Sequence, residues 1–109
     1  MIKDILTAAG VNFAQGRFLR MPEGTHAVYF DDITSTGADR GANASGLPRF
    51  YAHDVTVELY EPMPDDTVEE AIERELNAHG VEWNKQDRYW LKDLQRYQVV
   101  YEFSYTAKN

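Results

Sequence analysis

One stretch of the chain, residues 49–60, alternates in side-chain character so regularly that it constrains the whole fold. Its sequence is RFYAHDVTVELY, in which every second residue from Tyr51 to Leu59 is aromatic, aliphatic or histidine. Successive side chains of a β-strand point to opposite faces of a sheet, so this alternation predicts a strand with one buried face and one face in water. Other parts of the chain must therefore cover the apolar face.

A second stretch, residues 97–105, repeats this pattern and predicts another long strand. The residues expected on its inward face are Tyr97, Val99, Tyr101, Phe103 and Tyr105. A third strand is expected within residues 25–33, where a run rich in strand formers, Ala-Val-Tyr-Phe, stands between Gly24 and a pair of aspartates. Shorter extended segments are expected around Val11 and Trp83 and at residues 89–91, with a turn at residues 84–87.

Two amphipathic helices are predicted, one before and one after the first long strand. The first covers residues 2–9 and ends at Gly10, and the second covers residues 67–79 with Asp66 as its N-cap. Their apolar stripes consist of Ile2, Ile5, Leu6 and Ala9 in the first helix, and of Val68, Ala71, Ile72 and Leu76 in the second. The charged residues Glu69, Glu70, Glu73 and Arg74 are expected on the outer face of the second helix.

These elements predict a single α+β domain over residues 1–109. We expect a two-layer sandwich in which two helices cover one face of a mainly antiparallel sheet of about four strands. The other face of the sheet would carry Thr56, Glu58, Tyr60, Gln98, Val100 and Glu102. Such a face is polar enough for water and aromatic enough to meet a partner, so Glu58, Tyr60 and Glu102 are candidate contact residues.

Residues 34–46 have the sequence TSTGADRGANASG, which contains no side chain large enough to build a core. This composition predicts a long flexible loop, and loops of such length in small domains are usually either functional or disordered when alone. One interpretation is a simple hairpin tip, and another is a segment that becomes ordered against a neighbouring subunit. In the second interpretation the candidate contact residues are Thr36, Gly37, Asp39, Arg40 and Asn43.

Composition excludes several classes of protein. The chain has no cysteine, so thiolate zinc sites and cysteine nucleophiles are excluded. Its formal net charge of −7 argues against a protein that grips the nucleic-acid backbone, which requires clustered Lys and Arg. No apolar run approaches the roughly 20 residues of a membrane span.

No residue pattern in the sequence points to catalysis, to a metal or to a cofactor. His26, His53 and His79 lie in three different predicted elements, without the spacing of metal ligands or of a catalytic motif. Adjacent carboxylates such as Asp31 and Asp32 point to opposite faces of a strand and cannot act as an acid/base pair. We therefore expect a protein without enzymatic activity and without a cofactor.

The order of elements resembles that of the tail-terminator, or tail-completion, proteins of long-tailed bacteriophages and prophages. The resemblance covers nearly the whole chain, and it is one of pattern rather than of an invariant motif. Its most characteristic parts are the strand that ends in Val-Glu-Leu-Tyr, the acidic helix after it, and the closing strand Tyr-Gln-Val-Val-Tyr-Glu-Phe-Ser-Tyr.

The resemblance implies a virion structural protein that forms a homo-oligomeric ring, typically a hexamer, at the end of the tail tube. Such a ring stops tail growth and joins the tube to the head–tail connector, so the implied partners are the protein itself, the tail-tube protein and the connector. The implied location is the virion, and the host cytoplasm during assembly. Two alternatives stay open: another neck or minor capsid component, and a regulatory module that binds a small molecule through Glu58, Tyr60 and Glu102.

Overall fold

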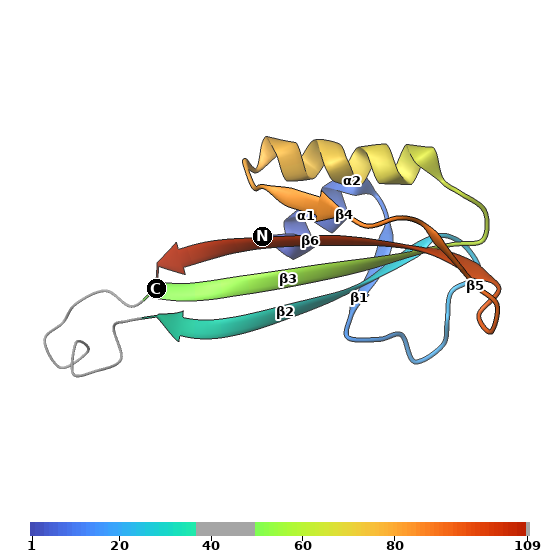
Figure 1. The fold of residues 1–109 in the computed structure, drawn as a ribbon, viewed down its shortest axis with the longest axis horizontal. Helices are drawn as coiled ribbons and strands as arrows, with labels where there is room; N and C mark the ends of the chain where they lie inside the picture. Colours follow the sequence, from blue (N-terminus) through green and yellow to red (C-terminus); the bar gives the residue numbers. More distant parts are fainter. Residues whose placement is uncertain (37–49, 109) are drawn as a thin grey trace, which may run out of the picture.

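The computed structural model describes residues 1–36 and 50–108, which form two helices and six strands (Figure 1). Along the chain these are α1 (Ile2–Ala9), β1 (Asn12–Gln15), β2 (His26–Thr36), β3 (Phe50–Glu61), α2 (Asp66–Ala78), β4 (Trp83–Lys85), β5 (Tyr89–Leu91) and β6 (Arg96–Lys108). The two long strands with alternating sequences are β3 and β6, and they pair with each other along their whole length.

The strands form one mixed sheet in the order β1-β2-β3-β6-β4, with β5 also paired to β6. All neighbours are antiparallel except β1 and β2, which run parallel. The predicted α+β class is confirmed, but the expected number of about four strands is too low. The additional strands β1, β4 and β5 have three or four residues each and lie at or near the segments expected to be extended. Segments this short show no alternation, and β4 includes Asn84 and Lys85 from the predicted turn because both pair with β6.

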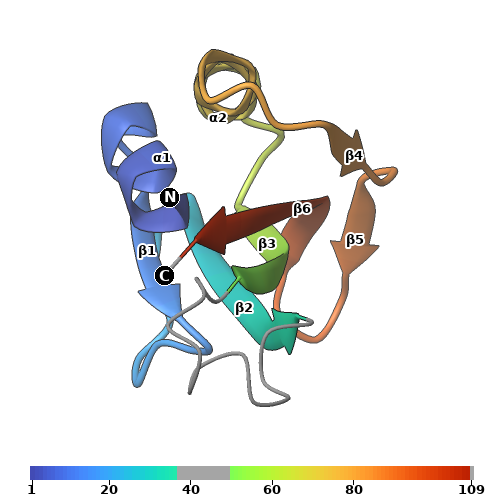
Figure 2. The same cartoon turned by 90° about the vertical axis from the view of Figure 1, so that its left-hand side faces the viewer.

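Both helices pack on the same face of the sheet, which gives the expected two layers (Figure 2). The core between the layers contains Ile2, Ile5 and Leu6 from α1, Ile72 and Leu76 from α2, and Val55, Val57, Leu59, Val99, Tyr101 and Phe103 from the two central strands. The inward faces predicted for β3 and β6 are therefore the ones that are buried. Burial of this single cluster is the main favourable contribution to folding.

The ends of the helices are close to the predicted positions, with one difference at the start of α2. Gly10 ends α1 in the left-handed conformation, with φ of 75°. The N-cap of α2 is Asp65 rather than Asp66, because the Asp65 carboxylate accepts a hydrogen bond of 3.3 Å from the backbone amide of Val68. A second oxygen of Asp65 accepts a 2.8 Å bond from the Thr25 hydroxyl, which fixes the helix start to the beginning of β2.

Strand β2 is longer than predicted, and this changes the interpretation of residues 34–46. Thr34, Ser35 and Thr36 continue β2 and pair with residues 50–52 of β3, although they were expected to begin a loop. The composition of these residues favours a loop. Hydrogen bonding to the edge of β3 favours a strand, and this contribution is the larger one. The predicted contact residues Gly37, Asp39, Arg40 and Asn43 lie outside the described residues.

Candidate functional site

The far half of the sheet extends past the helices, and only the start of α1 reaches its base, where Met1, Lys3 and Asp4 line a hollow with Asp31 and Ile33 (Figure 1). We call residues 30–36, 50–56 and 104–108 the projecting sheet. Strand β1 pairs only with residues 26–29, and β4 pairs only with residues 101–103. The projecting sheet therefore consists of β2, β3 and β6 alone within the described part of the chain. At about 3.3 Å per residue, seven residues of β2 extend it by roughly 23 Å.

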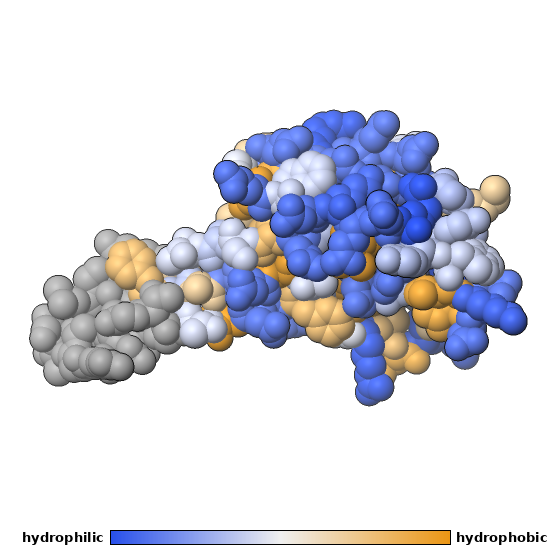
Figure 3. Space-filling model, in the orientation of Figure 1, coloured by the Kyte–Doolittle hydropathy of each residue, from blue (hydrophilic) through white to orange (hydrophobic). Residues whose placement is uncertain are grey.

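Apolar side chains of the projecting sheet are exposed on both of its faces. Ile33 is 57% exposed on the helix-side face, and Phe30 is 40% exposed on the opposite face. Figure 3 shows apolar surface along the sheet below a helix layer that is mostly hydrophilic. Ile33 and Phe30 lie on opposite faces and form no single patch, but each is available for contact with a partner that covers its face.

One polar cluster fixes the base of the projecting sheet on its helix-side face. Nδ1 of His53 lies 2.9 and 3.1 Å from the two carboxylate oxygens of Asp31 on the neighbouring strand. The His53 ring also stacks on Tyr105, with 4.4 Å between the ring centroids. Burial, and next the charge of Asp31, raise the pKa of Tyr105. The cluster joins β2, β3 and β6 through side chains at the point where the core ends.

The other two histidines are held separately. Nδ1 of His26 lies 2.9 Å from the Gly24 carbonyl, and Nδ1 of His79 lies 2.8 Å from the Glu75 carbonyl. His26 pairs with Tyr60, which is seven residues from His53 along β3, or roughly 23 Å at strand spacing. Within residues 1–36 and 50–108, no three His, Asp or Glu side chains converge in a way that could hold a metal ion.

Two of the three predicted contact residues on the open face are brought together, and the third lies apart. The Tyr60 hydroxyl donates a 2.9 Å hydrogen bond to Glu58 and accepts a 3.1 Å bond from the Gln98 amide. Burial, and next the bond to Glu58, raise the pKa of Tyr60. Glu102 instead accepts a 2.6 Å bond from the side chain of Gln86, which follows β4.

Each of these two groups lines a different hollow. Beside Tyr60 and Glu58 lies an open hollow of about 290 Å³, whose further lining residues include Phe18, Met21, His26, Val28 and Leu94. Glu102 lines a larger hollow of about 860 Å³ next to β4. The predicted set of three residues therefore does not form one site.

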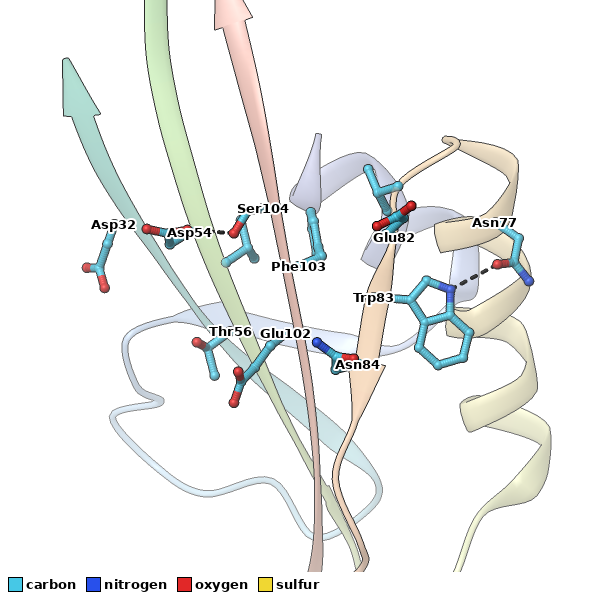
Figure 4. A pocket seen from close by; sticks show the side chains of 12 residues that line it. Asp32, Asp54, Thr56, Asn77, Glu82, Trp83, Asn84, Glu102, Phe103 and Ser104 are labelled. Atoms are coloured by element: carbon cyan, nitrogen blue, oxygen red, sulfur yellow. Dashed lines mark hydrogen bonds between the residues drawn. The ribbon is translucent and has the colours of Figure 1, made fainter. Parts of the chain in front are cut away.

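The larger hollow is acidic (Figure 4). Asp32, Asp54 and Glu102 approach it from the three long strands, and Glu82 approaches it from the segment before β4. Asp54 accepts a 2.5 Å bond from Ser104, and Trp83 donates a 2.9 Å bond to Asn77 at the opposite wall. Neither Lys nor Arg is among the residues that line it. A surface of this kind repels phosphate groups and attracts cations.

A buried cluster of charges, which was not predicted from the sequence, lies at the other end of the sheet under α2. Glu61 and Glu69 are 0% and 3% exposed. Arg88 contacts both, at 3.4 Å from Glu61 and 2.5 Å from Glu69, and Lys85 lies 2.8 Å from Glu69. The two basic residues thus connect the β4–β5 region to α2 and to the end of β3.

The pKa values of the two glutamates move in opposite directions. Burial, and next a hydrogen bond with Glu69, raise the pKa of Glu61 from 4.5 to about 7. Burial would also raise the pKa of Glu69, but hydrogen bonds with Glu61, Lys85 and Arg88 outweigh it and lower this pKa to about 2. One buried carboxyl therefore holds a proton more readily while the other stays ionised.

The expectation that Glu69 lies on the outer face of α2 is wrong. Glu69 precedes Ile72 by three residues and Leu76 by seven, so it lies on the same stripe of the helix as the core residues. This spacing was visible in the sequence, but the partners Lys85 and Arg88 were not, because they come from a different part of the chain.

No protein-family model matches the chain, and a search of curated proteins finds no similar one. In the part of the chain that the structure describes, neither helix is long and apolar enough to cross a membrane.

Proposed function

We propose that this protein is a structural component of a bacteriophage or prophage tail, which forms a homo-oligomeric ring at the end of the tail tube. In this role it terminates tail growth and joins the tube to the head–tail connector. The proposal begins from the resemblance in the order of elements. Its structural support is the projecting sheet, which extends away from the core and exposes Ile33 and Phe30 where a neighbouring chain could cover them.

The distribution of charge supports the same role. The acidic hollow lined by Asp32, Asp54 and Glu102 and the net charge of −7 would favour a ring through which DNA passes without adhering. The same properties suit other neck proteins, such as a head-closure or minor capsid component. A tail terminator binds the end of the tail tube, whereas the other neck proteins bind other partners. The test must therefore include a tail tube.

The experiment combines the purified protein with polymerising tail-tube protein and measures tube length and end structure by electron microscopy. Rings at tube ends and shorter tubes are expected. Native mass spectrometry of the end complexes gives the number of copies in the ring. Tubes that lengthen normally and carry no added protein at their ends would contradict the proposal.

A pair of variants tests whether the projecting sheet carries this activity. Ile33→Asp places a charge on the projecting sheet, and Met63→Asp places one at another exposed apolar position, 74% exposed, between β3 and α2. We expect Ile33→Asp to lose binding to tube ends and Met63→Asp to retain it. Equal behaviour of the two variants would remove the projecting sheet from the proposal.

A second candidate function, binding of a small molecule, is favoured by the hollow beside Tyr60. This hollow combines the apolar residues Phe18, Met21 and Leu94 with the polar pair Glu58 and Tyr60, as small-molecule sites often do. A ligand bound there would raise the melting temperature of the protein in a screen of metabolites. Any stabilising compound should lose its effect in a Tyr60→Phe variant if it binds at this hollow.

A further inference from the structure

The two outer edges of the projecting sheet carry backbone groups without a partner strand in the described part of the chain. On β2 the direction of these groups follows from one hydrogen bond, in which the Gly16 amide donates to the Tyr29 carbonyl at 2.9 Å. Carbonyls of successive strand residues point to opposite edges of the strand. Every second residue after Tyr29 therefore also directs its backbone N–H and C=O groups away from β3, namely Asp31, Ile33 and Ser35. Strand β1 ends at Gln15, opposite Tyr29, and therefore pairs with none of these three.

The opposite edge, on β6, is open in the same way. The amide of Gln86 donates a 2.9 Å bond to the Val100 carbonyl, so Val100 points away from β3. By the same alternation, the backbone N–H and C=O groups of every second residue after Val100 also point to this edge. These residues are Glu102, Ser104, Thr106 and Lys108. Glu102 is paired with Asn84 of β4, and Ser104 lies opposite Glu82, directly before β4, whereas Thr106 and Lys108 lie beyond it. The β2 edge thus presents three residues with outward N–H and C=O groups, and the β6 edge presents two.

These edges lack two of the features by which proteins protect exposed strands, proline and β-bulges, although β2 carries the charged residues Asp31 and Asp32. Described residues of the projecting sheet include no proline, and the pairing of β3 with both neighbours runs without a skipped residue, so no bulge twists an edge away. The near half of the same strands is covered, by β1 on one side and by β4 and β5 on the other. The remaining free edges of the sheet belong to strands of three or four residues.

We propose that the β6 edge of one copy pairs with the β2 edge of the next copy, so that the projecting sheets join into one continuous sheet; this rests on the proposed ring. Both strands run antiparallel to β3, hence parallel to each other, and the new pairing is parallel. Because the two edges lie on opposite sides of the projecting sheet, the contact is head-to-tail. Repetition of a head-to-tail contact closes a ring or continues as a filament.

Side chains support this arrangement. Ile33 and Tyr105 both pair with His53, from opposite sides, so they lie at the same height on the same face of the sheet. In a ring, copies lie at equal height, which places Ile33 of one copy beside Tyr105 of the next. A β-branched residue beside an aromatic ring is a favourable cross-strand neighbour, and it would cover the exposed Ile33 side chain.

Cross-linking tests this contact directly, because the chain has no cysteine of its own. The variant Ile33→Cys/Tyr105→Cys is oxidised in the presence of tail tubes and analysed by denaturing electrophoresis. Within one copy the two positions are two strands apart, roughly 10 Å, which is too far for a disulfide. We expect a ladder of cross-linked copies, whereas Met63→Cys/Tyr105→Cys should give none. A double-cysteine chain that stays monomeric on tube ends would overturn the pairing.

Proline variants test the backbone contribution. Ile33→Pro and Thr106→Pro each remove an outward N–H that β3 does not use, and Gln15→Pro makes the same change on the short β1 edge. We expect the first two to weaken self-association about tenfold or more and the third to leave it unchanged. Ile33→Thr, which keeps the N–H, should recover much of the loss seen in Ile33→Pro.

Mixing the two defective variants separates head-to-tail pairing from symmetric pairing. An equal mixture of Ile33→Pro and Thr106→Pro retains one intact edge pair and should give 1:1 dimers without rings. A stable dimer of Ile33→Pro alone would instead mean that β6 pairs with β6, and it would overturn the proposal. If both proline variants still form wild-type rings on tube ends, the edge pairing is wrong and the ring function stands. If the wild type forms no rings, both fail.

Discussion

At the scale of single residues, the buried carboxyl groups of Glu61 and Glu69 connect the stability of the fold to pH. Glu61 has a raised pKa, so its contribution to stability is fully present below pH 4.5 and is lost as the pH rises through 7. Glu69 has a lowered pKa, so its contribution is present above pH 4.5 and is lost as the pH falls through about 2. Between pH 4.5 and pH 7, therefore, only Glu61 of the two contributes a change of stability with pH.

The variant Glu61→Gln should therefore flatten the dependence of stability on pH. Gln is uncharged at every pH and resembles the protonated form of Glu61. From about pH 5 to about pH 8 the wild type should lose on the order of 1–3 kcal/mol of unfolding free energy relative to this variant. Chemical unfolding at several pH values measures this difference, with the exposed Glu70→Gln as the control. Parallel pH profiles for wild type and Glu61→Gln would contradict the expectation.

At the scale of elements, α2 illustrates how one side chain can tie a helix to the sheet. Asp65 caps the helix through Val68 and also accepts the hydrogen bond from Thr25 at the start of β2. Asp66, the residue expected to be the cap, is 84% exposed and lies 3.7 Å from Arg88. Neighbouring aspartates therefore have very different roles.

Asp65→Ala should lower the unfolding free energy by about 1–2 kcal/mol, because it removes the cap and the bond to Thr25. Asp66→Ala, its matched control, should change stability by less than about 0.5 kcal/mol, as expected for an exposed ion pair. Thermal or urea unfolding of the two variants distinguishes them. A larger effect at Asp66 would mean that the helix begins one residue later than the structure has it.

The sequence was sufficient for elements whose pattern is long enough to repeat. Strands β3 and β6 and both helices follow from periodicity, and the apolar residues of their inward faces were predicted correctly, whereas Glu69 of α2 was wrongly expected on the outer face. An extended segment was expected around Val11, but the pairing of β1 and the end of β2 could not be predicted, because Asn12, Thr34 and Thr36 take strand conformation only through a neighbour that is distant in sequence. Glu58 and Tyr60, which were predicted to share one face of the sheet, form a hydrogen bond with each other. The open edges of the projecting sheet were not predicted, because they depend on where the short strands β1 and β4 end.

At the scale of the whole molecule, the acidic charge sets a condition on assembly. Each copy carries a formal net charge of −7, so identical copies repel one another at long range. A contact made from backbone hydrogen bonds and apolar side chains is not strengthened at low salt. Dissolved salt screens the repulsion between the negatively charged copies. Self-association should therefore become favourable as the salt concentration rises.

We expect self-association of the protein to strengthen between about 50 mM and about 500 mM NaCl. Analytical ultracentrifugation over this range measures the change, and unfolding experiments at the same concentrations show whether the monomer itself is affected. Weaker association at high salt would point to a contact held by ion pairs between copies, and the edges of the projecting sheet would then not be the main contact.

The central position of β6 in the sheet has a consequence for the order of folding events. Its ladder with β3 joins residues 36 to 58 positions apart along the chain, from Glu61 with Tyr97 to Phe50 with Lys108. Pairings between such distant segments form late and slowly. Until β6 arrives, a chain that has formed the β2–β3 pair exposes the whole edge of β3, and β6 of another chain fits this edge as well as its own does. Refolding at high protein concentration should therefore produce dimers that have exchanged β6.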